Sequence, residues 1–224
     1  MPMRCTRDLQ RPKSAPQICV TTSCFPADSA VSRAPAADCL AALKALFRRR
    51  NIRWYLFGAH AAILFGRPRF TEDLDVTIEI DEPQLTSLLA ALERAHFRSR
   101  VEDPIAFTSR TRVMPVFHEP TSVPVDIVIA GDGLEREFLE RVVEAAFGRL
   151  KIPVLSPTDL IISKMIAGRP KDLDDVTGIL SARAKKWPID VARIEQTLTE
   201  VDAALGDSDC LAQFRKLRKA IVPG

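Results

Sequence analysis

The alternation of hydrophobic and polar residues predicts two strands on either side of a short helix in the first half of the chain. Trp54–Phe57 is a compact apolar run, which is typical of a buried strand. The small residues Gly58 and Ala59 follow it. The apolar segment His60–Phe65 then predicts a short helix, which ends at Gly66 and Pro68. Apolar and polar residues then alternate through Asp73–Ile78, which predicts the second strand.

The rest of the chain predicts further helices and strands, and hence a mixed α/β fold. Amphipathic helices are predicted over Asp38–Arg50, Asp81–Ala95, Leu134–Phe147, Ile189–Leu205 and Cys210–Ile221. Another helix is expected to begin at Ser156 and Pro157, which suit the N-cap and first helical positions. Strands are predicted over Arg112–Phe117, Val123–Ala130 and Lys151–Leu155, whereas the pattern of Phe97–Phe107 is ambiguous.

These elements divide the chain into three parts. Residues 1–36 combine scattered Pro, Ser and Thr with no apolar periodicity, so we expect a disordered tail or translation from an upstream start codon. Residues 37–155 contain the predicted α/β core. Residues 156–224 are predicted to form a helical region that completes the functional site.

Composition and charge exclude several classes of function. The net charge of +3 comes from residues 1–36, where five basic residues face two acidic ones, so the remainder is neutral and duplex DNA is not an expected partner. The longest uncharged apolar run, Trp54–Gly66, has 13 residues, which is too few to cross a membrane. The sequence contains no G-x-S-x-G, Walker or H-E-x-x-H motif. A lone late cysteine, Cys210, suits a reducing compartment, so we expect a cytoplasmic protein.

Carboxylates on the predicted strands indicate a metal site. Asp73 and Asp75 are two residues apart on a strand, so they share one face, where their like charges are unfavourable without a cation. Mg²⁺ prefers such oxygen ligands and is usually held by one or two carboxylates plus substrate phosphates. Asp126 is the only charged residue in Val123–Ala130, and a lone acid in an apolar strand is costly unless it is paired or metal-bound. The alternative is an edge-strand acid that faces solvent or pairs with an arginine.

The segment GAHAAILFGRPRFTEDLDV resembles the signature of the nucleotidyltransferase superfamily, which has two small residues followed by Asp-x-Asp. The residues that carry the resemblance are Gly58, Ala59, Arg69, Thr71, Asp73 and Asp75. The sequence of this segment is similar to those of a small prokaryotic branch of the superfamily, which includes abortive-infection toxins and minimal nucleotidyltransferase antitoxins. The resemblance covers roughly Asp38–Leu180 and implies a twisted mixed sheet flanked by helices. Ala59 stands where the family usually has Gly or Ser, so it lacks a hydroxyl for the triphosphate.

The same resemblance implies a set of site residues. The catalytic residues would be Asp73, Asp75, Asp126 and Lys164, and the three acids would bind Mg²⁺ or Mn²⁺. The segment SPTDLIISKMIAGRPKDLDD also resembles this branch. The nucleotide-binding residues would be Gly58, Ala59, Arg69, Thr71, Arg169, Asp172 and Asp175. For Asp172 and Asp175, which share a helix face, the alternative is a structural salt network at a helix start.

The implied activity is metal-dependent transfer of a nucleoside monophosphate from an NTP to a protein hydroxyl or an RNA end, within a toxin–antitoxin system. The alternative is a catalytically weak or inactive nucleotide-binding protein of the antitoxin type, which would bind a toxin partner. His60 lies beside this site, but a histidine in a short apolar helix is more often a hydrogen-bonded core residue. Arg48, Arg49 and Arg50 favour a solvated helix C-terminus over an RNA contact.

Overall fold

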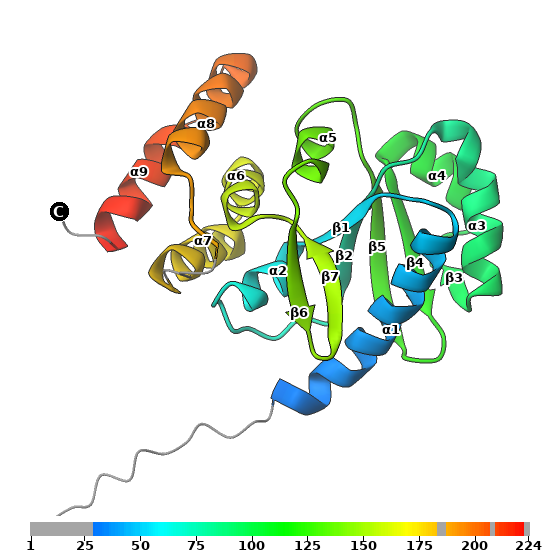
Figure 1. The fold of residues 1–224 in the computed structure, drawn as a ribbon. Coiled ribbons are helices and arrows are strands. Elements are labelled where there is room, and N and C mark those ends of the chain that lie inside the picture. Colours follow the sequence, from blue (N-terminus) through cyan, green and yellow to red (C-terminus); the bar gives the residue numbers. More distant parts are fainter. Residues whose placement is uncertain (1–28, 183–186, 207–208, 222–224) are drawn as a thin grey trace, which may run out of the picture.

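A mixed β-sheet flanked by helices forms the centre of the protein (Figure 1). The computed structural model describes residues 29–182, 187–206 and 209–221, and within these ranges the sheet has seven strands in the order β3-β4-β5-β2-β1-β7-β6. The strands are β1 (Trp54–Phe57), β2 (Leu74–Ile78), β3 (Phe97–Ser99), β4 (Val113–His118), β5 (Val123–Ile129), β6 (Val143–Phe147) and β7 (Leu150–Val154). The pairs β2–β5 and β1–β7 are parallel and the other pairs are antiparallel, which confirms the mixed α/β fold.

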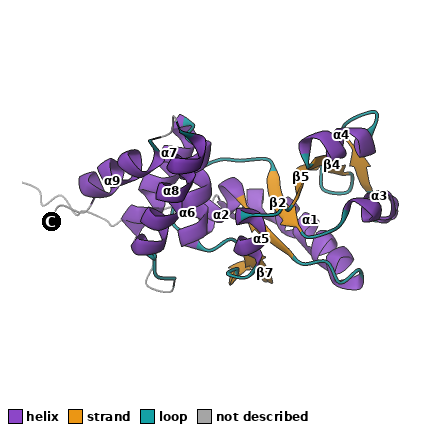
Figure 2. Ribbon diagram, turned by 90° about the horizontal axis from the view of Figure 1, so that it is seen from above, coloured by secondary structure: helices purple, strands orange, loops and turns teal. Residues whose placement is uncertain are grey.

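The helices group on opposite sides of the strands. They are α1 (Ser29–Arg49), α2 (Gly58–Leu64), the short 3-10 helix η1 (Glu82–Gln84), α3 (Leu85–Arg94), α4 (Pro104–Thr111), α5 (Leu134–Leu139), α6 (Pro157–Ala167), α7 (Pro170–Ala182), α8 (Val191–Leu205) and α9 (Cys210–Ile221). Seen from above in Figure 2, α6 to α9 form a helical group on one side, and α3 and α4 lie on the other. No helix in the described part of the chain has the length and hydrophobicity that crossing a membrane requires.

The predicted tail ends earlier than the sequence indicated. Helix α1 begins at Ser29 rather than at Asp38, so the expectation of disorder is wrong for residues 29–36, while residues 1–28 lie outside the described ranges. Pro35 lies inside the helix, where proline normally disfavours helical structure. Ala36 is only 5% exposed and joins Cys39 in the core, so tertiary packing extends the helix beyond its local propensity.

The predicted helix over Leu134–Phe147 is also wrong in its second half. Helix α5 ends at Leu139, and Val143–Phe147 forms β6, which pairs antiparallel with β7. The reason is the alternating burial in β6, where Ala145 and Phe147 are buried and their neighbours are exposed. Gly148, with a φ of 61°, closes the hairpin to β7 in a conformation that favours glycine.

Candidate functional site

The acids Asp75 and Asp126 lie opposite each other on β2 and β5. They are register partners in this parallel pair, so they project from the same face of the sheet at about one strand spacing, roughly 4.8 Å between backbones. Asp73 immediately precedes β2 and lines the same cleft, which has a volume of about 240 Å³. The structure therefore brings together the three predicted carboxylates, and it places the strand of Asp126 beside the motif strand.

The electrostatics of these acids favour a cation between them. Burial first, and then the negative charges of Asp126 and Asp73, raise the pKa of Asp75 from its ordinary value, to about 6 in all. The charge of Lys164 and a hydrogen bond from the Ala59 backbone N–H act in the opposite direction. The pKa of Asp126 is also raised, first by burial. The cluster thus carries negative charge that its protein neighbours only partly compensate.

Gly58 makes the close approach of β1 to this cluster possible. Phe57, at the end of β1, is the register partner of Asp75, and Gly58 begins α2 directly after it with a φ of 66°. A Cβ atom on Gly58 would lie 1.9 Å from the Asp75 Oδ2 atom. Glycine is therefore required at this position both by its backbone conformation and by the space that the carboxylate occupies.

A wall of cations faces the acids from α6 and α7. The Lys164 side chain, on α6, is 7% exposed. Its Nζ donates to Asp172 and lies 2.9 Å from a carboxylate oxygen of each of Asp172 and Asp175. Arg69, in the loop before β2, forms an ion pair with Asp175 at 3.1 Å, and Arg169 forms one with Asp172. Burial opposes ionisation of Asp172, but hydrogen bonds from Arg169 and Lys164 outweigh it and lower its pKa. These two buried acids hold the Lys164 ammonium in a fixed position.

Ten of the eleven predicted site residues line this one cleft. They are Gly58, Ala59, Arg69, Thr71, Asp73, Asp75, Asp126, Lys164, Arg169 and Asp172. Asp175 lies behind the wall, where it binds Lys164 and Arg69. The salt network that was the structural alternative for Asp172 and Asp175 is therefore present, and it also positions the cations of the cleft.

The sequence of residues 38–219 matches the family model described as "Nucleotidyltransferase of unknown function (DUF6036)". The chain belongs to this family. The match covers most of the chain and confirms the predicted nucleotidyltransferase resemblance. It concerns the family as a whole, so the abortive-infection branch stays a prediction.

Solved structures with a similar fold include other nucleotidyltransferases. The solution structure of the antibiotic-resistance factor ANT(2'')-Ia has a TM-score of 0.52 at 14% identity, covering 76% of this chain and 95% of that chain. The lincomycin-bound lincosamide antibiotic adenylyltransferase LnuA has a TM-score of 0.46 at 16% identity, covering 64% and 95%. An antigenic nucleotidyltransferase-like protein from Paracoccidioides brasiliensis has a TM-score of 0.46 at 15% identity, covering 85% and 96%. No curated protein sequence matches. The first of these likenesses supports the nucleotidyltransferase fold and nothing finer.

The donor set of this nucleotidyltransferase fits a divalent cation that arrives with its substrate. Among the described residues, no three His, Cys, Asp or Glu side chains are already arranged as a metal site. Asp75 and Asp126 nevertheless present two neighbouring carboxylates with raised pKa values, and Asp73 lies beside them. Mg²⁺ is commonly bound by one or two carboxylates plus phosphate oxygens and water, so two facing acids are sufficient protein ligands.

Sequence reasoning missed three polar or charged residues at the site. Ser163 and Lys171 line the cleft from α6 and α7. Lys171 was visible as a further cation in the segment that carries Arg169 and Asp172. Arg100 forms an ion pair with Asp126, but it comes from the segment for which the sequence predicted no element. His60 is buried and its ring nitrogen Nδ1 lies 3.0 Å from the Asp73 backbone oxygen, as expected for a hydrogen-bonded core histidine.

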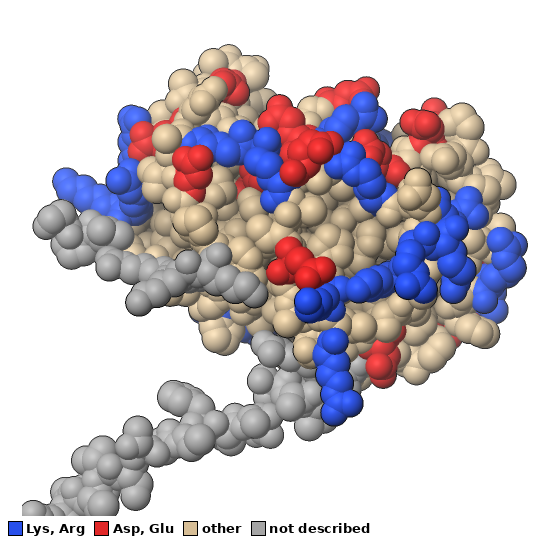
Figure 3. Space-filling model, in the orientation of Figure 1, with Lys and Arg blue, Asp and Glu red and all other residues tan. Residues whose placement is uncertain are grey.

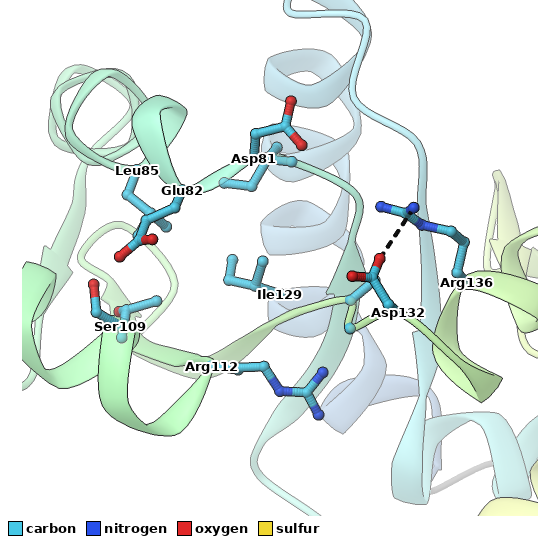
Figure 4. A pocket seen from close by; sticks show the side chains of 12 residues that line it. Asp81, Glu82, Leu85, Ser109, Arg112, Ile129, Asp132 and Arg136 are labelled. Atoms are coloured by element: carbon cyan, nitrogen blue, oxygen red, sulfur yellow. Dashed lines mark ion pairs between the residues drawn. The ribbon is translucent and has the colours of Figure 1, made fainter.

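A second pocket, of about 270 Å³, lies beyond the C-terminal ends of β2 and β5 (Figure 4). Both basic side chains of its lining form ion pairs, Arg136 with Asp132 at 3.1 Å and Arg112 with Glu135, which is outside the lining, at 3.0 Å. Figure 3 shows acidic and basic side chains interspersed on one face, with basic ones gathered toward the end of α1. That end of α1 leads into the start of β1, whereas the cleft lies at the other end of the strand. Three acids also line the pocket, Asp81, Glu82 and Asp132, but they lie beyond the strands, whereas Asp75 and Asp126 lie on paired strands.

Proposed function

We propose that this protein transfers a nucleoside monophosphate from an NTP to an acceptor hydroxyl, with Mg²⁺ or Mn²⁺ bound at the carboxylate cluster. The observation that carries the proposal is the division of one cleft into two sides. Asp73, Asp75 and Asp126 lie together at the sheet, and Lys164, Arg169 and Lys171 line the same cleft from the C-terminal helices. This is the charge distribution that a metal–triphosphate substrate requires.

The cationic wall binds the triphosphate. The ammonium of Lys164 is held by two fully buried acids, so it needs no rearrangement to face a phosphate. Arg169 is 60% exposed, so its guanidinium can turn from Asp172 toward a ligand at small cost. Gly58 leaves to the Asp75 carboxylate the space that a side chain at position 58 would fill. Together these residues place the α-phosphate of the substrate against the acids.

The transfer forms one bond and breaks one. The acceptor oxygen attacks the α-phosphorus, the bond from that phosphorus to the bridging β-phosphate oxygen breaks, pyrophosphate leaves, and the hydroxyl proton passes to water or to a carboxylate of the cluster. Asp73, Asp75 and Asp126 would hold the divalent metal, which supplies Lewis-acid activation of the acceptor oxygen and stabilises the leaving group. Lys164 and Arg169 stabilise the charge that develops on the phosphates.

A groove beside the cleft favours a protein hydroxyl over an RNA end as the acceptor. It has a volume of about 450 Å³, shares Thr71 with the cleft, and includes Pro124, which lies on the same face of β5 as Asp126. Its walls include Phe70, which is 75% exposed, and no Lys or Arg occurs among the described residues that line it. An RNA backbone needs cations along its path, whereas an apolar peptide segment does not.

Calorimetry with ATP, CTP, GTP and UTP, with and without Mg²⁺, tests the nucleotide part of the proposal. We expect binding that requires Mg²⁺ and that Asp75→Asn greatly weakens, because the amide keeps the shape of the side chain and loses its charge. Equal binding with and without Mg²⁺ would contradict a metal site.

A second experiment tests the acceptor. Transfer of label from α-labelled NTPs to peptide pools rich in Ser, Thr and Tyr is compared with transfer to total RNA. Label on RNA alone would refute the peptide acceptor.

One observation favours a second candidate function, that of a nucleotide-binding protein with weak or no transferase activity. Ala59 has no hydroxyl, and its backbone N–H already donates to Asp75, so it offers the triphosphate less than a serine would. A nucleotide-binding protein of the antitoxin type would bind NTPs in calorimetry and transfer no label. Copurification with the product of the neighbouring gene would test the proposed toxin or antitoxin partner.

A further inference from the structure

Arg100 is aligned with Asp126 across three strands. Its backbone N–H donates to the Pro115 carbonyl oxygen at 3.0 Å, which continues the β3–β4 ladder one residue beyond β3. Pro115 is in turn the register partner of Asp126 in β4–β5. Residues in one such row project from the same face of the sheet. The side chain of Arg100 therefore extends over Pro115, and its guanidinium donates to the Asp126 carboxylate.

This ion pair differs from the others in the cleft because both partners are accessible. The side chains of Arg100 and Asp126 are 38% and 37% exposed, whereas Asp172 and Asp175, which hold Lys164, are fully buried. An exposed ion pair contributes little free energy and separates readily, whereas a buried one is costly to break. Arg100 is thus the removable cation of the site and Lys164 the fixed one.

We propose that Arg100 is a latch that occupies Asp126 while the site is metal-free and that a divalent metal displaces it. The inference rests on the proposed function, because it assumes that Asp126 is a metal ligand. Asp126 faces Asp75, so the pair needs a nearby positive charge whether or not metal is bound. The guanidinium occupies one oxygen of Asp126 and repels a second cation beside it, so the metal and Arg100 compete for the same carboxylate.

Arg98 provides a matched control for this competition. It lies two residues before Arg100 and on the same face of the sheet, its side chain is 56% exposed, and it pairs with Glu119 at 3.1 Å rather than with an acid of the cleft. Arg98→Gln and Arg100→Gln each remove one exposed guanidinium from this face. Only the second removes the proposed competitor of the metal.

The first experiment measures Mn²⁺ binding by the electron paramagnetic resonance signal of free Mn²⁺. We expect Arg100→Gln to bind Mn²⁺ about two- to fivefold more tightly than the wild type, which is the range that an exposed ion pair allows. Arg98→Gln and the charge-preserving Arg100→Lys should bind within about twofold of the wild type. Unchanged or weaker binding by Arg100→Gln would overturn the latch.

The second experiment separates a latch from an ordinary structural ion pair by thermal unfolding. Arg100→Gln should unfold at a lower temperature than the wild type in EDTA, because Asp126 then loses the cation that pairs with it. Saturating Mg²⁺ should abolish or reverse this difference, since the metal replaces the guanidinium. An equal loss of stability in both conditions would show a structural role only and would overturn the proposal.

The two proposals fail in different ways. If the wild type binds Mn²⁺ and Arg100→Gln binds it equally well, the latch is wrong and the metal-dependent transfer stands. If neither protein binds Mn²⁺ with or without NTP, the metal site itself is wrong, and the latch falls with it.

Discussion

Gly58→Ala tests whether the close approach of the helix start to Asp75 is required. The added Cβ would lie 1.9 Å from Oδ2, 2.6 Å from Cγ and 2.9 Å from Cβ of Asp75. Rotating the carboxylate cannot relieve this overlap, because the Asp75 Cβ is itself too close, so the backbone must move. Overpacking of this kind costs about 1–3 kcal/mol. The φ of 66° adds about 1–2 kcal/mol for a residue with a Cβ.

Gly148→Ala is the control that isolates the overlap. Gly148 has a φ of 61°, and a Cβ there would meet no atom within 4 Å. It should therefore lose only the backbone contribution, about 1–2 kcal/mol, whereas Gly58→Ala should lose about 2–5 kcal/mol. Urea denaturation of both variants measures the difference in the free energy of unfolding. If Gly58→Ala is no less stable than Gly148→Ala, the contact between Gly58 and Asp75 does not constrain the site as argued.

Three further predictions follow from the charges and the helix boundaries. In metal-free buffer, burial and Asp126 raise the pKa of Asp75 from 3.8 to about 6, so between these values the folded state keeps a proton that the unfolded state has lost, and stability falls as pH rises. The Asp75→Asn variant lacks this titrating group, so its free energy of unfolding relative to that of the wild type should increase by about 1–3 kcal/mol between pH 4 and pH 7, as measured by urea denaturation. The same pH dependence in both proteins would contradict this prediction. Lys164→Ala should destabilise by about 3–5 kcal/mol because it leaves buried Asp172 and Asp175 short of a cation, whereas Arg169→Gln should change stability by less than about 1 kcal/mol and weaken NTP binding in calorimetry. Deleting residues 1–36 should lower the melting temperature, since it removes the first turns of α1 and the buried Ala36; an unchanged value would show that these turns add no stability.

The parts of the site that the sequence predicted are those that local pattern determines. Asp75 stands in an alternating strand after two small residues, and Asp126 is the lone charge of an apolar strand, so strand periodicity alone gives their faces. Arg100 escaped prediction because its role depends on the register of β3, β4 and β5 together. The same limit explains why β6 was predicted as part of a helix. Its pairing with β7 is a contact between two strands, which the pattern of one segment does not reveal.

The charges around the cleft explain why nucleotide and metal should bind together. Five basic side chains, Arg69, Arg100, Lys164, Arg169 and Lys171, balance five acidic ones, Asp73, Asp75, Asp126, Asp172 and Asp175. A triphosphate alone would bring several negative charges into this balanced site, and a metal alone would have to displace Arg100. When both bind, the charges of the phosphates and the metal offset each other. The basic side chains of the C-terminal region then face the phosphates, and the acids of the sheet face the metal. Because coupling between two ligands is reciprocal, the factor by which Mg²⁺ strengthens NTP binding must equal the factor by which NTP strengthens Mg²⁺ binding.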